Sequence, residues 1–351
     1  MLEFAPARRL AAAGVATLAL ALLLGAAGAQ GAGVLVAYNL YPLVSDGSAV
    51  PAPLADPSLV NGWGLVAGPT TPWWTSNNKT NTSTLYNGGG SKSALTVTVP
   101  GGPTGIIFNA NPADWNGGRF IFATQSGTIQ WWSSGGSSNT GADNSSQGAL
   151  YDGLASLNDR LYAADFHNGR IDVFDNAFHP VSLPNAFTDA KIPAGFAPFN
   201  IQALNGNLFV TYAKQDAAKK NSIPAPGQGY VDEFDPNGVL MMRVASSGNK
   251  NAPLNAPWGL ALAPSNFGAY SNDLLVGNFG NGRINAYAPA SATKWVYKGQ
   301  VRTADGKPIT VDGLWGIAFG TGGSSGPTNN LYVLAGPTNQ THGLLGFIAV
   351  G

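Results

Sequence analysis

The side chains in this chain that could do chemistry are few, and most of them are oxygen donors. Cysteine is absent and only three histidines occur, His167, His179 and His342. Thiol nucleophiles, thiolate metal sites and disulfides are excluded, and a three-histidine zinc site would need every histidine. Carboxylate and amide oxygens suit a hard divalent cation such as calcium, beside which His167 or His342 could act as a base. The candidate metal ligands are Asp312, Asn200, Asp165 and Asn278.

A second group of residues could bind a ligand without reacting with it. Tryptophan precedes glycine and an aliphatic residue at Trp63, Trp258 and Trp315. These rings could form a platform for a sugar ring or an apolar ligand, but we favour the alternative that each wedges between neighbouring repeats. Arg170 and Arg283 each follow an Asn-Gly turn, so they contact a ligand or simply maintain the repeat. Asp165 and Asn278 are equivalent in the same way, which favours a turn-stabilising role for both.

Composition restricts both the fold and the partners. Charged residues make up 10% of the 351 residues, and 18 basic side chains balance 18 acidic ones. Without excess positive charge, neither nucleic acid nor an acidic membrane surface is an expected partner. Gly occurs 47 times and Pro 24 times, whereas the only glutamates are Glu3 and Glu233, so long surface helices are disfavoured. The sequence therefore predicts mostly β structure.

The first 29 residues differ from the rest of the chain. Arg8 and Arg9 precede an apolar run over residues 10–27, and Ala29 ends a small-residue pattern. This is typical of a secretory signal peptide, whereas a membrane anchor is less well supported because the run is rich in alanine and lacks flanking aromatics. We expect cleavage after Ala29, a single domain over residues 30–351 without a transmembrane anchor, and a secreted or periplasmic location.

Six repeats organise that domain. Six short apolar segments begin alike, and the steps between their equivalent positions are 41, 48, 47, 59 and 57 residues. These positions are Gly64, Gly105, Gly153, Asn200, Gly259 and Gly316. Residues 161–174 align without a gap on residues 274–287, and each of these segments reads as two strands joined by an Asn-Gly turn. Such units predict an all-β, six-bladed β-propeller of four-stranded blades.

The predicted ring also needs loops and a closure. Residues 214–228 and 133–146 are polar insertions, and both read as solvated loops. The last unit is one strand short, whereas residues 34–40 have strand composition and no partner in their own unit. We therefore expect residues 34–40 to pair with the strand near residues 344–348 and to close the ring.

At these motifs the sequence resembles known propellers. The pattern of Gly259, Asn278, Arg283 and Ile284 is similar to the NHL-type repeat of six-bladed β-propellers. Tyr38-Asn39-Leu40 followed by residues 61–65 resembles a family of uncharacterised secreted bacterial propellers. Some of its members carry a PEP C-terminal sorting tail, which is absent here. The resemblance implies the fold and export, and it implies no activity.

Two functions are compatible with these observations. The composition favours an exported, non-catalytic binding or scaffold propeller for an unknown extracellular ligand or protein. The alternative is a metal-assisted, lactonase-like hydrolase, since six-bladed lactonases hold a divalent ion over the central channel. In either case the expected face is the one where the innermost strands begin. For the hydrolase, Asp312 and Asn200 should point into the channel with a histidine nearby.

Overall fold

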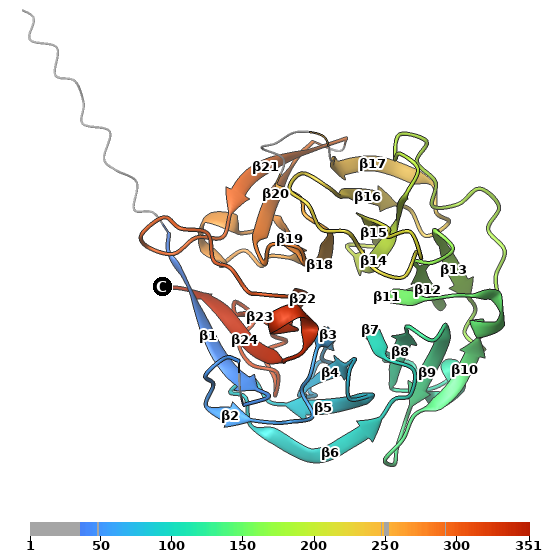
Figure 1. The fold of residues 1–351 in the computed structure, drawn as a ribbon, viewed down its shortest axis with the longest axis horizontal. Coiled ribbons are helices and arrows are strands. Elements are labelled where there is room, and N and C mark those ends of the chain that lie inside the picture. Colours follow the sequence, from blue (N-terminus) through green and yellow to red (C-terminus); the bar gives the residue numbers. More distant parts are fainter. Residues whose placement is uncertain (1–35, 48, 247, 249–252, 292) are drawn as a thin grey trace, which may run out of the picture. The chain divides into compact units, whose positions relative to one another are not determined.

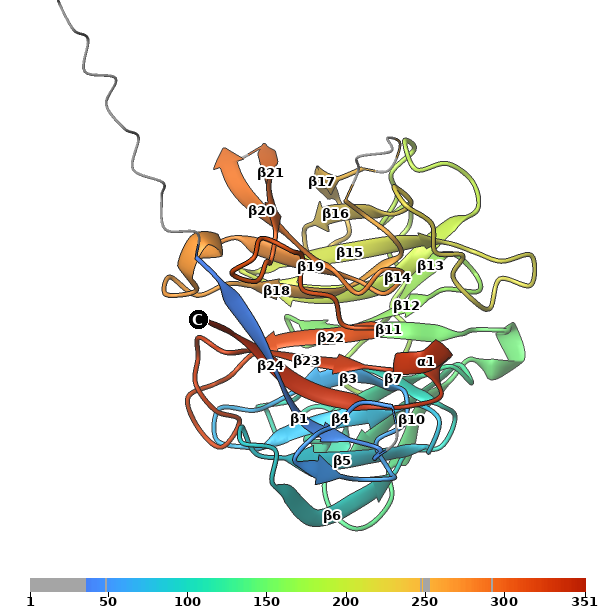
Figure 2. The same cartoon turned by 60° about the vertical axis from the view of Figure 1, so that its left-hand side comes forward.

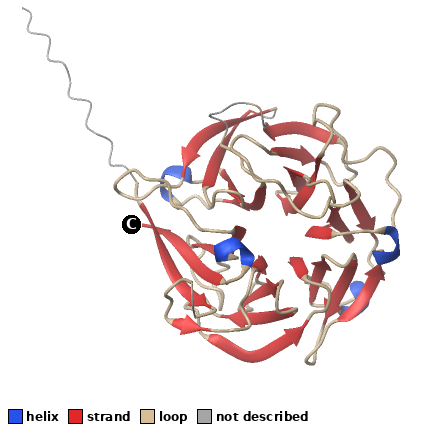
Figure 3. Cartoon of the chain, viewed as in Figure 1, coloured by secondary structure: helices blue, strands red, loops and turns tan. Residues whose placement is uncertain are grey.

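Six β-sheets radiate around a central axis in the computed structural model, which describes residues 36–351 except 48, 247, 249–252 and 292 (Figure 1). The predicted signal peptide over residues 1–29 lies outside the described residues. Figure 3 shows that strands and loops account for almost all of this part of the chain. None of its helices is long and apolar enough to cross a membrane.

The sheets follow one another along the chain as blades. Blade 1 contains β3 (Gly62–Val66), β4 (Trp73–Asn77), β5 (Thr82–Tyr86) and β6 (Lys92–Thr98). Blade 2 contains β7 (Pro103–Phe108), β8 (Phe120–Thr124), β9 (Thr128–Trp132) and β10 (Asn139–Asp143). Blade 3 contains β11 (Tyr151–Leu157), β12 (Arg160–Asp165) and β13 (Arg170–Phe174). Blade 4 contains β14 (Phe196–Leu204), β15 (Asn207–Lys214), β16 (Tyr230–Phe234) and β17 (Leu240–Ala245). Blade 5 contains β18 (Pro257–Leu262), β19 (Leu274–Asn278), β20 (Ile284–Ser291) and β21 (Lys294–Gln300). Blade 6 contains β22 (Leu314–Phe319), β23 (Leu331–Ala335), β24 (Leu344–Val350) and β1 (Tyr38–Ser45), with β2 (Leu54–Ala55) at its edge. The short helix α1 (Pro337–Gln340) precedes β24.

This arrangement confirms the six-bladed β-propeller. The third sheet has three strands rather than four, and Phe174 adds one isolated bridge to Pro180 at its outer edge. The loop predicted over residues 133–146 is wrong for β10, which forms the outer strand of blade 2. An exposed edge strand needs only backbone hydrogen bonds to one neighbour, so a polar sequence with no apolar alternation can form one.

The N-terminal strand closes the ring, as predicted. β1 pairs antiparallel with β24, from Tyr38 opposite Val350 to Ser45 opposite Leu344. Figure 2 shows β1 running alongside β24. The Tyr38 hydroxyl donates to the Phe267 carbonyl oxygen at 2.8 Å, so β1 is also tied to blade 5. Of the strand expected over residues 34–40, residues 34 and 35 lie outside the described part of the chain, and the observed pairing runs on to Ser45.

The repeated glycines let the innermost strands approach one another at the axis. A Cβ atom at Gly64 would lie 2.3 Å from the Thr104 carbonyl oxygen in the next blade. A Cβ atom at Gly316 would lie 2.6 Å from the Trp63 carbonyl oxygen. Since real Cβ atoms do not approach backbone oxygens so closely, a side chain at either position would push neighbouring blades apart. This steric requirement explains the repeat that is visible in the sequence.

Candidate binding site at the central channel

Aromatic rings from four blades plug the central channel. Trp63 stacks on Trp315 with ring centroids 3.5 Å apart, and Trp315 also stacks on Phe279 at 4.1 Å. The Trp258 ring meets both Trp63 and Trp315 edge-on, and Phe199 of the opposite blade packs against the same pair. The three tryptophans are 1–4% exposed. They are therefore buried, as the structural alternative predicted, but they meet at the axis instead of wedging between neighbouring blades.

Hydrogen bonds hold two of the three plug tryptophans. The Trp315 Nε1 donates to Asn61 Oδ1 at 3.0 Å, and the Trp258 Nε1 donates to the Asp152 carbonyl oxygen across the channel at 3.1 Å. The Trp63 Nε1 is buried and has no partner within the described part of the chain. A buried N–H group without a partner is destabilising, and this distinguishes Trp63 from the other two tryptophans.

A small pocket lies above this plug, on the face where the inner strands begin. We call it the front pocket; its volume is about 50 Å³. Its aromatic residues are Trp63, Phe199, Phe279 and Trp315, and its polar residues are Gln125, Asp152, Lys220, Asn221, Ser222 and Gln340. Lys220, Asn221 and Ser222 belong to the insertion predicted as a solvated loop. That loop is largely exposed, but it also reaches the centre of the propeller.

Side-chain amides form a hydrogen-bonded chain around the front pocket. The Asn61 Nδ2 donates to Gln340 Oε1 and to Asn78 Oδ1, each at 3.2 Å. The Asn78 Nδ2 donates to Gln125 Oε1 at 3.0 Å. The chain therefore links blades 6, 1 and 2 and fixes the orientation of both glutamines that line the pocket.

Asp152 lies beside this chain and is a functional candidate that sequence reasoning missed. It is 1% exposed, and its Oδ1 finds no hydrogen-bond partner among the described residues. Burial raises the pKa of this carboxyl well above its ordinary value; a hydrogen bond with the Gln125 side chain opposes the rise in pKa, and the negative charge of the nearby Asp165 adds to it. One signal was available, because Asp152 precedes Gly153 at the repeat position where Trp63, Trp258 and Trp315 stand in other blades.

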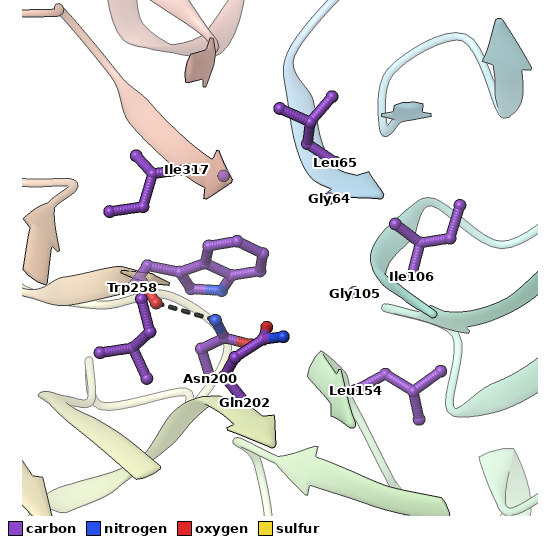
Figure 4. Close-up of a pocket in the computed structure, with 11 residues that line it drawn as sticks. Gly64, Leu65, Gly105, Ile106, Leu154, Asn200, Gln202, Trp258 and Ile317 are labelled. Carbon is purple, nitrogen blue, oxygen red and sulfur yellow. Dashed lines mark hydrogen bonds between the residues drawn. The ribbon is translucent and has the colours of Figure 1, made fainter. Parts of the chain in front are cut away.

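Below the plug the channel narrows to a chamber of about 20 Å³ (Figure 4). Asn200 stands here in place of the repeated glycine, and its Nδ2 donates to the Trp258 carbonyl oxygen at 2.8 Å. In Figure 4 the Gln202 side chain lies beside Asn200. The chamber leads to a wider basin of about 360 Å³ where the inner strands end, lined mostly by apolar side chains such as Leu65, Leu204 and Phe319. We call this the rear basin.

The four candidate metal ligands are not brought together. Asp312 is exposed on a turn, accepts a hydrogen bond from the Thr338 N–H at 2.7 Å, and is not among the residues that line the front pocket or the chamber below the plug. A residue between two strands can extend its side chain outward as easily as inward, and the sequence pattern does not distinguish the two. Asn200 is engaged with the Trp258 carbonyl oxygen.

The other two candidates hold turns. Asp165 Oδ1 accepts from the Leu150 N–H, and Asn278 Oδ1 accepts from the Asn255 N–H, each at 3.1 Å. These equivalent contacts fasten the segment that leads into the inner strand of the same blade, which fits the turn-stabilising alternative. Within the part of the chain that the structure describes, no three His, Asp or Glu side chains are grouped so that they could hold a metal ion.

The candidate bases and the two arginines lie at separate places. His342 contacts Asp46 through its Nδ1 at 2.6 Å, next to the end of β1. His167 is half-buried at the β12–β13 hairpin, where its carbonyl oxygen accepts from Gln215. Arg170 is exposed and pairs with Asp172 at 2.7 Å, and Arg283 is exposed at the equivalent position of blade 5. None of these four side chains is among those that line the front pocket.

Solved structures with the same fold differ widely in sequence. A protein of unknown function from Bacteroides thetaiotaomicron superposes with a TM-score of 0.57 at 11% identity, over 89% of this chain and 76% of that one. Virginiamycin B lyase from Staphylococcus aureus superposes with a TM-score of 0.52 at 13% identity, over 90% of this chain and 100% of that one. At such low identity these similarities show the propeller fold alone.

Sequence comparison gives nearer relatives. No protein-family model matches the chain. The uncharacterised protein L690 of Acanthamoeba polyphaga mimivirus is 31% identical over 291 residues, which cover 75% of this chain and 74% of L690. The uncharacterised protein R648 of the same virus is 32% identical over 292 residues, covering 75% of this chain and 69% of R648. These relatives are viral rather than bacterial, so the resemblance to secreted bacterial propellers stays a prediction. The chain belongs to the family that includes the mimivirus proteins L690 and R648.

Proposed function

We propose that this protein is an exported, non-catalytic binding propeller that holds its ligand in the front pocket, above the aromatic plug. One observation carries the proposal. The Trp63 Nε1 and the Asp152 Oδ1 are both buried without a partner among the described residues, both residues line this pocket, and the Asp152 carboxyl is otherwise hydrogen-bonded to Gln125. Buried polar groups are normally hydrogen-bonded, so two such atoms at one pocket indicate that a bound molecule completes the site.

The residues around the pocket favour binding over metal-assisted hydrolysis. They are mainly aromatic rings, amides and a hydroxyl, which hold a neutral ligand by packing and hydrogen bonding. The groups that would carry hydrolysis are already engaged elsewhere, with Asp312 bonded to the Thr338 N–H and His342 in contact with Asp46. A divalent cation such as calcium is therefore not part of the proposal, and calcium is included in the experiment below as a competing ligand.

A thermal-shift screen with two blocking variants tests the location. The purified protein is screened against a diverse set of small molecules and against calcium chloride. Ser222→Trp fills the front pocket, and the matched variant Ala318→Trp fills the rear basin. We expect the stabilising compounds to lose their effect in Ser222→Trp only. Compounds that lose it only in Ala318→Trp would place the ligand at the rear basin, and calcium-dependent hydrolysis of a lactone would contradict a non-catalytic role.

Export has its own test. The full chain is expressed in a bacterial host, the cell fractions are separated, and the N-terminus of the accumulated protein is sequenced. A signal peptide ending at Ala29 predicts a mature chain that begins at Gln30 outside the cytoplasm. An uncleaved chain that stays in the cytoplasm would contradict export while leaving the binding proposal open to the screen.

A further inference from the structure

We propose that the insertion of blade 4 carries a lid over the front pocket, and that the ligand enters when this lid opens. The inference rests on the proposed function and adds how the site is reached. We define the lid as residues 216–222, the tip of the insertion between β15 and β16. Three properties of the lid carry the inference: what it covers, what holds it together, and how it is fastened to the propeller.

The lid forms part of the wall of the front pocket. Lys220, Asn221 and Ser222 line the pocket, and the rings of the plug lie below it. A volume of about 50 Å³ holds a few water molecules, whereas a cavity that encloses a small organic ligand has a volume of roughly 300 Å³ or more. A larger ligand therefore needs a wider pocket, and the wall can recede most readily where it is not part of the core.

The lid lies outside the hydrophobic core. Residues 217–221 are exposed, and no lid side chain belongs to the hydrophobic clusters found among the described residues. Segments with few apolar contacts and exposed backbone open at a lower free-energy cost than the strands of a core. The lid can therefore leave the pocket while the six blades stay folded.

Asp216 holds the lid together as one unit. Its N–H donates to the Asn221 carbonyl oxygen at 2.8 Å. Its Oδ1 accepts from the Lys220 N–H and its Oδ2 accepts from the Asn221 Nδ2, each at 2.9 Å. Because these bonds join residues within the lid, they do not have to break when the lid moves.

Two fixed points bound the lid. Before it, the Gln215 Nε2 donates to the carbonyl oxygens of Phe166 and His167 in blade 3. After it, the Gly227 N–H donates to the Leu254 carbonyl oxygen at 2.9 Å, on the segment that leads into blade 5. The Gln215 amide therefore acts as a latch that joins the base of the lid to the neighbouring blade.

Thiol labelling measures access to the pocket without requiring a known ligand. The chain contains no cysteine, so each single introduced thiol reports on its own position. Asp152→Cys places a reporter in the front pocket, where the residue is 1% exposed. Ala163→Cys is the buried control within β12, and Gln202→Cys is the control on the other side of the plug. The purified variants are treated with methyl methanethiosulfonate, and mass spectrometry follows the rate of labelling.

Two lid variants then change the rate. Gln215→Ala removes the latch and should accelerate labelling of Asp152→Cys about five- to tenfold. Replacing residues 216–221 by Asn-Gly keeps the pairing of Gln215 with Ser222 and removes the rest of the lid, so we expect at least about tenfold faster labelling. Labelling of Ala163→Cys and Gln202→Cys should change less than about twofold. Gln147→Ala, an exposed glutamine outside the lid, is the matched control for Gln215→Ala.

Several outcomes would overturn the lid. It is rejected if neither lid variant accelerates labelling in the front pocket, if Gln147→Ala accelerates it as much as Gln215→Ala does, or if Ala163→Cys is accelerated equally, since that would indicate unfolding of the whole domain. Phe199→Cys is a second reporter in the same pocket if Asp152→Cys folds poorly.

The labelling result and the proposed function can fail separately. A compound that stabilises the protein and is excluded by Ser222→Trp would retain the front pocket as the binding site even if labelling rejected the lid. Faster labelling in both lid variants, with no stabilising compound that is excluded by Ser222→Trp, would count against the proposed function and not against opening of the lid.

Discussion

Replacing the plug tryptophans one at a time by phenylalanine separates ring packing from hydrogen bonding. All three rings are buried in the same cluster. Trp258 and Trp315 each donate a hydrogen bond through Nε1, whereas the Trp63 Nε1 has no partner among the described residues. The smaller phenylalanine ring buries less apolar surface, which lowers the free energy of unfolding by about 1 kcal/mol at every position. The three variants therefore differ mainly in what happens to the N–H group and its acceptor.

The expected costs follow from that difference. Trp315→Phe leaves the buried Asn61 Oδ1 without its donor, and Trp258→Phe removes the hydrogen bond to the Asp152 carbonyl oxygen. Each change therefore adds about 1–3 kcal/mol to the loss of stability from packing. Trp63→Phe instead removes a buried unpaired donor, and that relief offsets the lost packing. We expect the free energy of unfolding to fall by about 2–4 kcal/mol for Trp258→Phe and Trp315→Phe, and by about 0–1 kcal/mol for Trp63→Phe.

Urea unfolding followed by far-ultraviolet circular dichroism measures these differences. The alanine variants serve as the reference, because Trp→Ala at any of the three positions should cost about 3–5 kcal/mol. The midpoint should move least for Trp63→Phe. Equal losses for the three phenylalanine variants, or the largest loss for Trp63→Phe, would refute the reasoning that the Trp63 N–H lacks a partner in the folded protein.

Three further predictions concern the ring and its buried carboxyl. Tyr38→Ala should cost about 3–5 kcal/mol in thermal or urea unfolding because Tyr38 is fully buried and joins the closing strand to blade 5, and a loss below about 1 kcal/mol would contradict closure by β1. Gly64→Ala should destabilise the protein by at least about 2 kcal/mol because its Cβ would meet the Thr104 carbonyl oxygen, whereas the control Gly136→Ala has open space and should change little; similar midpoints for the two would argue against close blade contact. The raised pKa of Asp152 means that the folded state binds the carboxyl proton more tightly than the unfolded state does, so the free energy of unfolding should fall as the pH rises from about 4 through the folded pKa. Asp152→Asn should lessen this pH dependence and raise the free energy of unfolding at neutral pH, and an unchanged pH profile would count against a buried carboxyl.

Much of the fold could be predicted because its determinants are local or periodic. Gly259 and Gly316 recur at the spacing of one blade, and each is required by contact with the next inner strand. The hairpin after Leu161 repeats after Leu274 because an Asn-Gly turn suits two antiparallel strands. Closure by the N-terminal strand could be predicted because the last repeat was one strand short and residues 34–40 had no partner strand in their own repeat. Export and the signal peptide are also sequence predictions, and they remain to be measured.

The candidate site depended on tertiary structure because its parts come from every blade. Asp152 and Trp258 are 106 positions apart in the chain, and only the closed ring places one across the channel from the other. The inserted loop looked solvated because its composition is polar, and composition does not show that Ser222 reaches the axis. Asp312 was predicted to lie at the channel because it comes just before an inner strand, on the face of the propeller where these strands begin. The direction of its side chain on that turn depends on its hydrogen bonds, which the sequence does not show. The sequence by itself therefore determined the number of blades and how they close. The tertiary structure decided which side chains meet at the axis. Six inner strands pack around one narrow channel, and two rings cannot occupy the same space there.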